Sequence, residues 1–188
     1  MANLFIISDT HFGHANILNF KREDGSSVRN FASVEVMDEL MVERWNSVVR
    51  PQDKVYHLGD VAMSKKDIAT IGRCNGHKRL VRGNHDDHPL KEYLKYFEEV
   101  YATRVLDRMI FSHIPIHPNS MGKHLANVHG HIHNPLRDVY GPLYYNVSVE
   151  VVNYTPIALE DLKNKVSVQK MDKTALQELV DYDKEIGI

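Results

Sequence analysis

The sequence lacks the features that mark a secreted, membrane-spanning or nucleic-acid-coating protein. Cys74 is its single cysteine, which excludes a disulfide framework and a zinc site built from thiolates. No apolar run is long enough to cross a bilayer, and the formal net charge of -2 offers no broad basic surface for extended duplex nucleic acid. We therefore expect a cytoplasmic protein, without membrane attachment, that holds any charged substrate in a local site.

Histidine is the residue that the sequence has in excess. The chain contains 12 histidines among 188 residues, and they are not evenly spread. The length suits one domain with a sizeable core, so we expect residues 1–188 to form a single domain. The hydrophobic and charged fractions are ordinary for a globular protein, so the histidines and their neighbours are the features that bear on function.

Short apolar runs predict buried strands that alternate with helices along the chain. The expected strands cover residues 3–7, 54–58, 78–81, 98–106, 108–112, 126–129 and 143–152. The expected helices cover residues 15–20, 34–49, 64–73, 89–97 and 155–165, and a last helix begins at Asp172 or Thr174. This alternation predicts a layered α/β architecture with a mostly parallel or mixed sheet.

Polar side chains follow these strands where each one ends. They are Asp9, His11, Asp60, Asn84, His85, His113, His131 and His133. Open α/β sheets gather their ligands at the carboxyl ends of their strands, so we expect these side chains to meet. Any one of the histidines alone would more often be structural. Together the carboxylates, the amide and the imidazoles exceed what one ion needs and suit two, with Asp60 as the bridging carboxylate.

The chemistry of this ligand set narrows the choice of metal. Carboxylate, carboxamide and imidazole ligands without thiolate favour borderline or harder divalent ions. We expect two divalent ions, with Mn favoured and Ni, Fe, Co or Zn as alternatives. Two such ions about 3.5–4 Å apart can hold phosphoryl oxygens and a bridging hydroxide in line with a leaving group.

The same segments resemble the motifs of the calcineurin-like metallophosphoesterase family. The matching segments are Asp9-x-His11, Gly59-Asp60, Gly83-Asn84-His85-Asp86, the single His113 and Gly130-His131-x-His133. They occur in the family's order and extend over most of the chain. The resemblance implies a four-layer α/β/β/α sandwich with the site at one edge.

The resemblance also implies a role for each residue. One ion is held by Asp9, His11 and His133, and the other by Asn84, His113 and His131, with Asp60 between them. His85 is then not a ligand but protonates the leaving group after attack by the bridging hydroxide, and Asp86 orients it. A histidine titrates in the range that this proton transfer needs.

The residues beside the motifs narrow the expected activity further. Phosphoprotein phosphatases of this family carry an arginine shortly after Gly-Asp, and purple acid phosphatases carry a tyrosine ligand there. This chain has neither, since it continues as Val61-Ala62-Met63-Ser64. It is also too short for the extra parts of the family's repair nucleases. The resemblance therefore implies a small phosphodiesterase-type hydrolase acting on a cyclic or linear nucleotide-type diester.

Two other functions stay open at this point. A phosphomonoesterase acting on a small molecule or nucleotide is the first alternative, because the same motifs serve both reactions. A non-catalytic scaffold on the same fold is the second, because some family members act as interaction subunits. The loops 21–30 and 114–127 are expected to set specificity. His14 and His117 are the candidate substrate contacts within or beside them.

Overall fold

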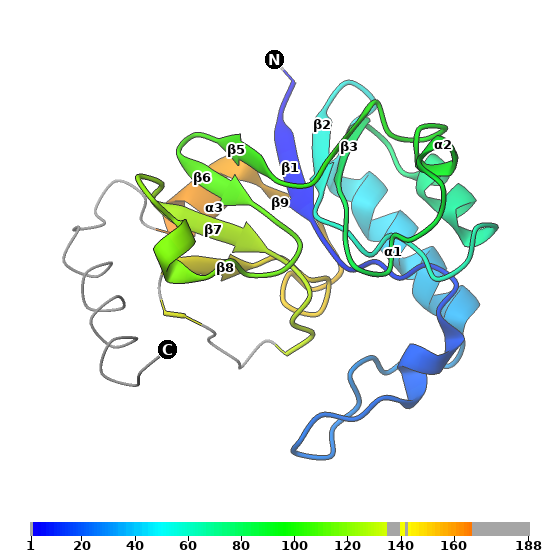
Figure 1. Ribbon diagram of the computed structural model, residues 1–188. Helices are drawn as coiled ribbons and strands as arrows, with labels where there is room; N and C mark the ends of the chain where they lie inside the picture. Colours follow the sequence, from blue (N-terminus) through cyan, green and yellow to red (C-terminus); the bar gives the residue numbers. More distant parts are fainter. Residues whose placement is uncertain (1, 135–139, 142, 167–188) are drawn as a thin grey trace.

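The computed structural model describes residues 2–134, 140–141 and 143–166, and two β-sheets lie at its centre (Figure 1). The larger sheet has the strand order β4-β3-β2-β1-β9, and the smaller has the order β5-β6-β7-β8. The strands of the larger sheet are β1 (Leu4–Ile7), β2 (Lys54–His57), β3 (His77–Val81), β4 (Glu99–Tyr101) and β9 (Ile157–Ala158). Those of the smaller sheet are β5 (Arg104–Leu106), β6 (Met109–Phe111), β7 (Ala126–His129) and β8 (Tyr144–Asn146).

Most neighbouring strands in both sheets run parallel. β1 to β4 are parallel and β9 is antiparallel to β1, while β6 to β8 are parallel and β5 is antiparallel to β6. Parallel strands need crossover connections, which α1 (Val34–Val48), η2 (Asp67–Arg73) and α2 (Leu90–Tyr93) supply in the larger sheet. The carboxyl ends of the parallel strands therefore share one edge in each sheet.

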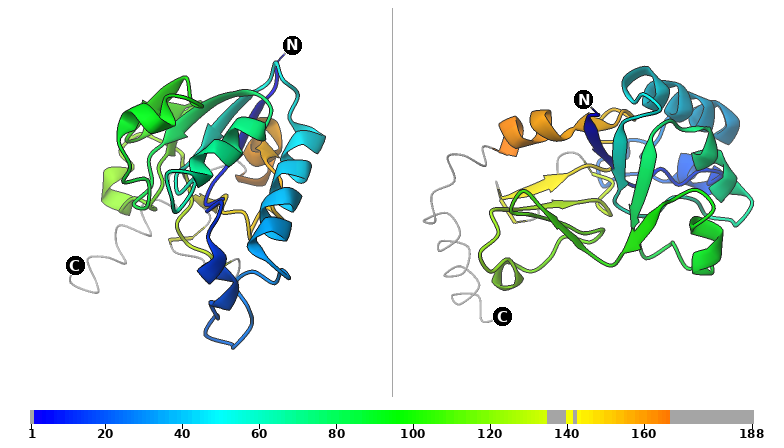
Figure 2. Two further views of the ribbon diagram at one scale, coloured as in Figure 1. Left: turned by 90° about the vertical axis from the view of Figure 1, so that its right-hand side faces the viewer. Right: turned by 90° about the horizontal axis from the view of Figure 1, so that it is seen from above.

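The larger sheet is covered on both faces. Successive side chains of β1 point to opposite sides, so Phe5 and Ile7 pack in the core beneath α1 while Ile6 packs toward the smaller sheet. Figure 2 shows from further directions that α1 and the smaller sheet lie on opposite sides of the larger sheet. Burial of both faces explains why the strand reads as a continuous apolar run.

Helix α1 begins where its sequence predicts. The Ser33 side chain accepts a hydrogen bond from the Val36 N–H at 3.3 Å and so caps the first turn. Met37, Met41 and Trp45 are buried against the sheet, as their helical spacing indicates. Val36 itself is 51% exposed, because it lies in the first turn on the side away from the sheet.

The two sheets join at the edge where β1 ends. The Ser8 N–H donates to Val147 O at 3.0 Å, and the Val149 N–H donates to Ser8 O at 3.1 Å. These bonds connect the chain just before Asp9 to the segment that follows β8. The edges that carry the predicted site residues therefore adjoin each other.

The mixed α/β class with parallel strands flanked by helices is confirmed, whereas the four-layer sandwich stays a prediction. Among the described residues, the outer face of the smaller sheet packs against the segment around the 3₁₀ turn η3 (Pro118–Ser120), through Met121. Helix α3 (Leu159–Val166) buries Leu162 in the core between the sheets. The last predicted helix, from Asp172 or Thr174, lies outside the described residues.

Several element boundaries differ from expectation. The run 98–106 is divided into β4 and β5, which belong to different sheets, because the chain bends at Ala102. The expected helices at 15–20 and 64–73 are the 3₁₀ helices η1 (Ala15–Asn19) and η2, and β9 precedes α3. Helix α2 is a single turn in place of the expected helix 89–97, and Leu90 and Leu94 are exposed.

No helix within the described ranges is long and apolar enough to cross a membrane.

Candidate metal centre

The predicted ligands follow the strands whose carboxyl ends share the common edge. Asp9 and His11 follow β1, Asp60 follows β2 and Asn84 follows β3 in the larger sheet. In the smaller sheet, His113 follows β6, and His131 and His133 follow β7. The chain turns sharply at this edge. Asp9, His11, Asp60 and His131 all have positive φ, between 48° and 68°. Such backbone is uncommon outside glycine and concentrates at functional sites.

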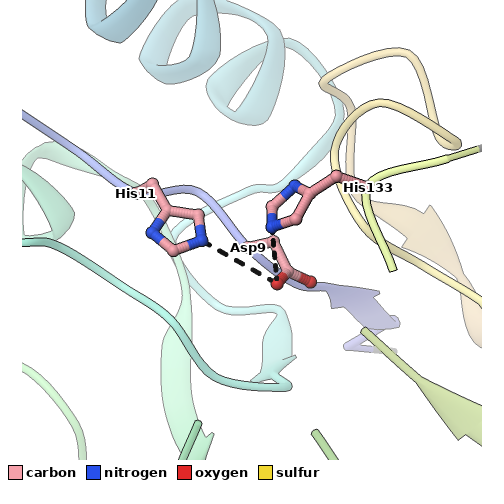
Figure 3. Close-up of side chains that lie close together, drawn as sticks. All are labelled: Asp9, His11 and His133. Atoms are coloured by element: carbon pink, nitrogen blue, oxygen red, sulfur yellow. Dashed lines mark ion pairs between the residues drawn. The ribbon is translucent and has the colours of Figure 1, made fainter. Parts of the chain in front are cut away.

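One group of ligand atoms consists of Asp9, His11 and His133 (Figure 3). Asp9 Oδ1 lies 3.6 Å from His133 Nε2 and 4.0 Å from His11 Nε2. One ligand atom from each residue lies within 4.8 Å of the others, which is close enough for one ion to contact all three. We call these residues the first ligand group.

A second ligand group consists of Asp60, His113 and His131, with Asn84 beside it. Asp60 Oδ2 lies 3.2 Å from His113 Nε2, and Asn84 Oδ1 lies 2.9 Å from the same nitrogen. The rings of His113 and His131 meet edge to face with their centroids 5.2 Å apart. The amide oxygen of Asn84 is thus available as a further ligand of this group.

Asp60 lies between the two groups. Its Oδ2 atom is 3.5 Å from His11 Nε2 in the first group and 3.2 Å from His113 Nε2 in the second. Its other oxygen, Oδ1, accepts a hydrogen bond from the His85 N–H at 2.9 Å, which fixes the orientation of the carboxylate. Asp60 is therefore the residue placed to contact two ions at once.

The tautomer of His113 shows that its donor set fits a cation. Its Nδ1 lies 2.8 Å from the Leu58 carbonyl, which can only accept, so Nδ1 carries the proton. In the neutral ring Nε2 then has a lone pair, yet it faces oxygens of Asn84 and Asp60 at 2.9 and 3.2 Å. Acceptor atoms converge there from three residues, and a divalent ion among them would satisfy all of them.

The electrostatics of the first group also suit a cation. Burial, together with the nearby Arg29 charge, lowers the pKa of His11 to about 2, so this imidazole is neutral at physiological pH. Its Nδ1 atom is buried and has no hydrogen-bond partner among the described residues. Burial alone would raise the pKa of Asp60, but the hydrogen bond and charge of His113 lower it to about 2. Neutral imidazole and ionised carboxylate are the forms that bind metal.

Two glycines let the loops approach each other closely. A Cβ atom on Gly83 would lie 2.1 Å from Asp60 Oδ1 and 2.5 Å from Asp60 N. A Cβ atom on Gly130 would lie 2.0 Å from Ser8 Oγ and 2.2 Å from Asp9 Oδ2. Each glycine therefore makes room for the carboxylate of one ligand group.

Asp86 has a contact set that differs from its expected role. Its buried carboxylate accepts three backbone N–H groups, from Asp60 at 2.8 Å, Val61 at 3.0 Å and Gly83 at 2.8 Å. These bonds fasten the loop after β2 to the loop after β3. Within the described contacts, this carboxylate positions Asp60 and does not orient the His85 ring.

The remaining histidines from the sequence lie at different distances from the ligands. His85 is exposed, and its ring centroid is 5.5 Å from that of His11. The His14 ring is 5.7 Å from that of His11 and 5.7 Å from Phe20, which is 50% exposed. His117 instead accepts the Asn119 N–H at 3.2 Å as the cap of η3, and its ring centroid lies 6.4 Å from that of Tyr140.

Two buried residues at this site were not identified from the sequence as parts of it. Arg29 donates to Glu150 Oε1 at 2.6 Å, and the same oxygen lies 2.9 Å from His133 Nδ1. Glu150 is the one charged residue in the expected strand 143–152, whose other residues are mostly apolar. A charged residue within an apolar run is the signal that could have identified it.

Comparisons with known proteins identify relatives of this chain. The chain is 34% identical over 188 residues to the uncharacterized protein MJ1445 of Methanocaldococcus jannaschii, and the match covers 93% of this chain and 97% of that protein. It is 29% identical over 177 residues to the gene 66 protein of Mycobacterium phage L5, covering 72% of this chain and 80% of that protein.

A solved structure has a similar fold. The Aquifex aeolicus protein of unknown function AQ665 matches with a TM-score of 0.70 and 28% identity, covering 87% of this chain and 99% of that chain. No family model matches the chain. The similarity to AQ665 and MJ1445 therefore extends over most of the sequence.

Proposed function

The chain belongs to the same family as the Methanocaldococcus jannaschii protein MJ1445, and we propose that it is a metal-dependent phosphoesterase that hydrolyses a nucleotide-type phosphodiester. The observation that carries the proposal is the pair of ligand groups that share Asp60. For these two groups, the resemblance to calcineurin-like metallophosphoesterases implies the same ligands, with Asn84 added to the second group. The donor set favours two divalent ions, with manganese as the first choice.

The metal ions would supply Lewis acidity, which neutralises phosphoryl oxygens and activates a water molecule. The protein's own residues would hold and protonate the substrate. His85 is exposed beside the ligands, and its backbone N–H is fixed by Asp60 Oδ1 at 2.9 Å. Its side chain is therefore free to reach a bound ester while its backbone stays in place. We assign it the role of proton donor to the leaving oxygen.

The charge near the ligands favours a diester over a monoester. A monoester carries more negative charge at its phosphate and benefits from an additional cation that contacts it. Arg29 is close to the first ligand group but is buried, and its guanidinium donates to Thr10 O, Asp9 O and Glu150. It is thus committed to the protein and does not reach a substrate.

An aromatic side chain beside the ligands supports an organic, nucleotide-type substrate. Phe20 is 50% exposed and contacts His14, which in turn contacts His11. An exposed ring at this distance from the site can stack on a base or pack against a ribose. We propose that His14 and Phe20 contact the organic part of the substrate.

The experiment that tests this function measures turnover by metal-stripped protein on matched esters. The panel contains bis-(p-nitrophenyl) phosphate and p-nitrophenyl phosphate, followed by cyclic and linear nucleotide diesters and the matching nucleotide monoesters. Mn, Ni, Zn or Mg is restored in turn. We expect metal-dependent turnover with the diesters faster than the monoesters. Faster release of p-nitrophenol from the monoester would indicate a phosphomonoesterase and not a phosphodiesterase.

The scaffold alternative gives a distinct result in the same experiment. If both ions are shown to be bound and every ester in the panel is left intact, the ligand groups serve a structural role. The presence of every ligand together with an exposed His85 favours the enzyme, because a scaffold needs neither.

A further inference from the structure

A buried ion pair lies behind the first ligand group. Arg29 Nε and Glu150 Oε1 are 2.6 Å apart, and the two side chains are 0% and 1% exposed. The residues are 121 positions apart in the sequence, so the pair joins distant segments. Burying an ion pair rarely adds stability compared with apolar residues of the same size. Its presence here therefore calls for a role other than packing.

Among the described residues, the main-chain and imidazole groups that bond to this pair belong to the turn of Asp9 and His11 or to His133. Arg29 Nη1 donates to Thr10 O at 2.8 Å, and Nη2 donates to Asp9 O at 2.5 Å. Both carbonyls belong to the turn that presents Asp9 and His11. On the other side, Glu150 Oε1 accepts the Nδ1–H of His133 at 2.9 Å. The pair thus fixes all three ligands of one ion from behind.

The contact with His133 has a chemical consequence. A carboxylate that accepts the Nδ1–H fixes the tautomer in which Nε2 carries the lone pair, and it makes that nitrogen a stronger donor to a metal. His133 Nε2 is the atom that faces Asp9, at 3.6 Å. Glu150 therefore both orients the ligand atom and increases its basicity.

The second ligand group lacks such support among the described residues. The Nδ1–H of His113 donates to the neutral carbonyl of Leu58 at 2.8 Å, not to a carboxylate. Asp60 is positioned through backbone N–H groups bonded to Asp86. A neutral carbonyl raises the basicity of an imidazole less than a carboxylate does.

We propose that Arg29 and Glu150 are positioning residues that make the two metal sites unequal. The site formed by Asp9, His11 and His133 binds its ion first and more tightly, and the site formed by Asp60, His113 and His131 fills second. The inference rests on the binuclear centre of the proposed function. It does not depend on which ester is hydrolysed, because it concerns metal binding alone.

The test is a calorimetric titration of metal-free protein with Mn²⁺ in the absence of any substrate. Wild-type protein should show two binding steps of different affinity. Glu150→Gln keeps a hydrogen-bond acceptor of the same size but removes the charge, and it should weaken the tighter step by about 10–100-fold. The weaker step should change by less than about threefold, since its ligands have no contact with Glu150.

Two further variants identify the steps. His133→Ala should remove the tighter step, whereas His113→Ala should remove the weaker one. Arg29→Lys provides a second route if Glu150→Gln folds poorly, because it keeps the charge and loses the paired contacts to Thr10 O and Asp9 O. It should also weaken the tighter step selectively.

Glu39→Gln is the matched control. It removes a carboxylate from an exposed pair with Arg73 at 2.6 Å and should alter neither step.

The proposal is overturned by two equal steps in the wild type, or by equal weakening of both steps in Glu150→Gln. It is also overturned if His133→Ala removes the weaker step. Absence of turnover on the ester panel would count against the proposed enzyme but would leave these affinities readable. The two failures are therefore distinguishable.

Discussion

The two ligand groups are built by the same kind of strand end but are held in place by different chemistry. The first group is fixed from behind by charged side chains, Arg29 and Glu150, which bond to its main chain and to His133. The second group is fixed by main-chain contacts. Asp86 accepts hydrogen bonds from backbone N–H groups, and Leu58 O accepts one from the His113 Nδ1–H. One site can therefore be tuned by single side-chain changes, while the other depends on the path of two loops.

This difference predicts how each group responds to substitution. A change that removes charge behind the first group should alter affinity and leave the fold intact. A change that moves the loop after β3 should alter the second group together with stability. Asp60 reaches both groups, so it is the residue through which disturbance of one site would pass to the other.

The largest expected effect is on catalysis and involves neither group. His85→Ala should lower kcat by about 10²–10⁴-fold, because general acid catalysis contributes that much. Both ions should stay bound, since the backbone N–H that bonds to Asp60 is kept in this variant. Metal analysis and steady-state kinetics measure the two properties separately.

The matched control for this variant is His77→Ala. His77 is an exposed histidine on β3, paired with Glu98 at 2.6 Å, and its loss should leave kcat unchanged. Loss of a bound ion from His85→Ala would show that His85 is a ligand, and full activity would remove it from the mechanism.

The next largest effect comes from adding a Cβ atom to the glycine that contacts each ligand group. Gly83→Ala places a Cβ atom against the backbone of Asp60 and should destabilise the metal-free protein by about 1–3 kcal/mol. It should also weaken the second group. Gly130→Ala meets side-chain atoms of Ser8 and Asp9, so it should weaken the first group at a smaller cost in stability.

Thermal unfolding and metal content measured on both variants check this contrast. Gly72→Ala is the control, because its Cβ atom would meet a ring atom of Tyr96 at 2.9 Å, away from the ligands. Equal loss of both ions from both variants would show that the groups are not separable in the way their supports indicate.

A smaller effect is expected on substrate affinity. Phe20→Ala should raise KM for a nucleotide diester by up to about tenfold, because an aromatic contact is worth about 0.5–1.5 kcal/mol. KM for a diester with small alkyl groups should stay the same. Metal affinities should not change, since Phe20 contacts His14 and no ligand. An equal rise in KM for both esters would remove Phe20 from base recognition.

The mildest effect is a pH dependence shared by the groups. Burial opposes protonation, but bonds to Asp60 and Glu150 raise the pKa of His113 and His133 above 6.5 in the metal-free protein. The stability that these protonated rings contribute is complete below the unfolded pKa and is lost as pH rises through the raised pKa. Metal binding runs in the opposite sense, because ions need the neutral ring.

Manganese affinity should therefore fall as pH decreases, starting above about pH 6.5, the ordinary histidine value. Calorimetric titration at several pH values measures it, with circular dichroism to verify that the metal-free fold persists. Affinity that stays flat or rises toward acid would contradict the assignment of these two histidines as ligands.

Much of the candidate site follows from sequence because it depends on strand ends. Asp9, Asp60 and Asn84 each come within three residues of the end of a strand, and parallel strands bring such positions to one edge. The order of the strands along the chain is therefore enough to predict that these three side chains lie near one another. The capping of α1 by Ser33 is equally local, and the helix begins at Val34, where the expected range 34–49 begins.

The parts that sequence did not predict depend on tertiary contacts. Glu150 is 17 residues from His133 and 121 from Arg29, and no periodic pattern links such positions. Asp86 was expected to orient its neighbour His85, but its carboxylate reaches Asp60, 26 residues away. The division of the run 98–106 between two sheets has the same origin. Strand propensity indicates extended backbone but not which sheet receives it.

The most direct test of a shared metal centre is the electron paramagnetic resonance spectrum of metal-free protein loaded with Mn²⁺. A centre that shares Asp60 predicts two ions per chain, close enough to be magnetically coupled, and a spectrum that differs from that of isolated Mn²⁺. Asp60→Ala should abolish the coupling. A single ion per chain, or two ions with the spectrum of isolated Mn²⁺, would contradict a shared centre.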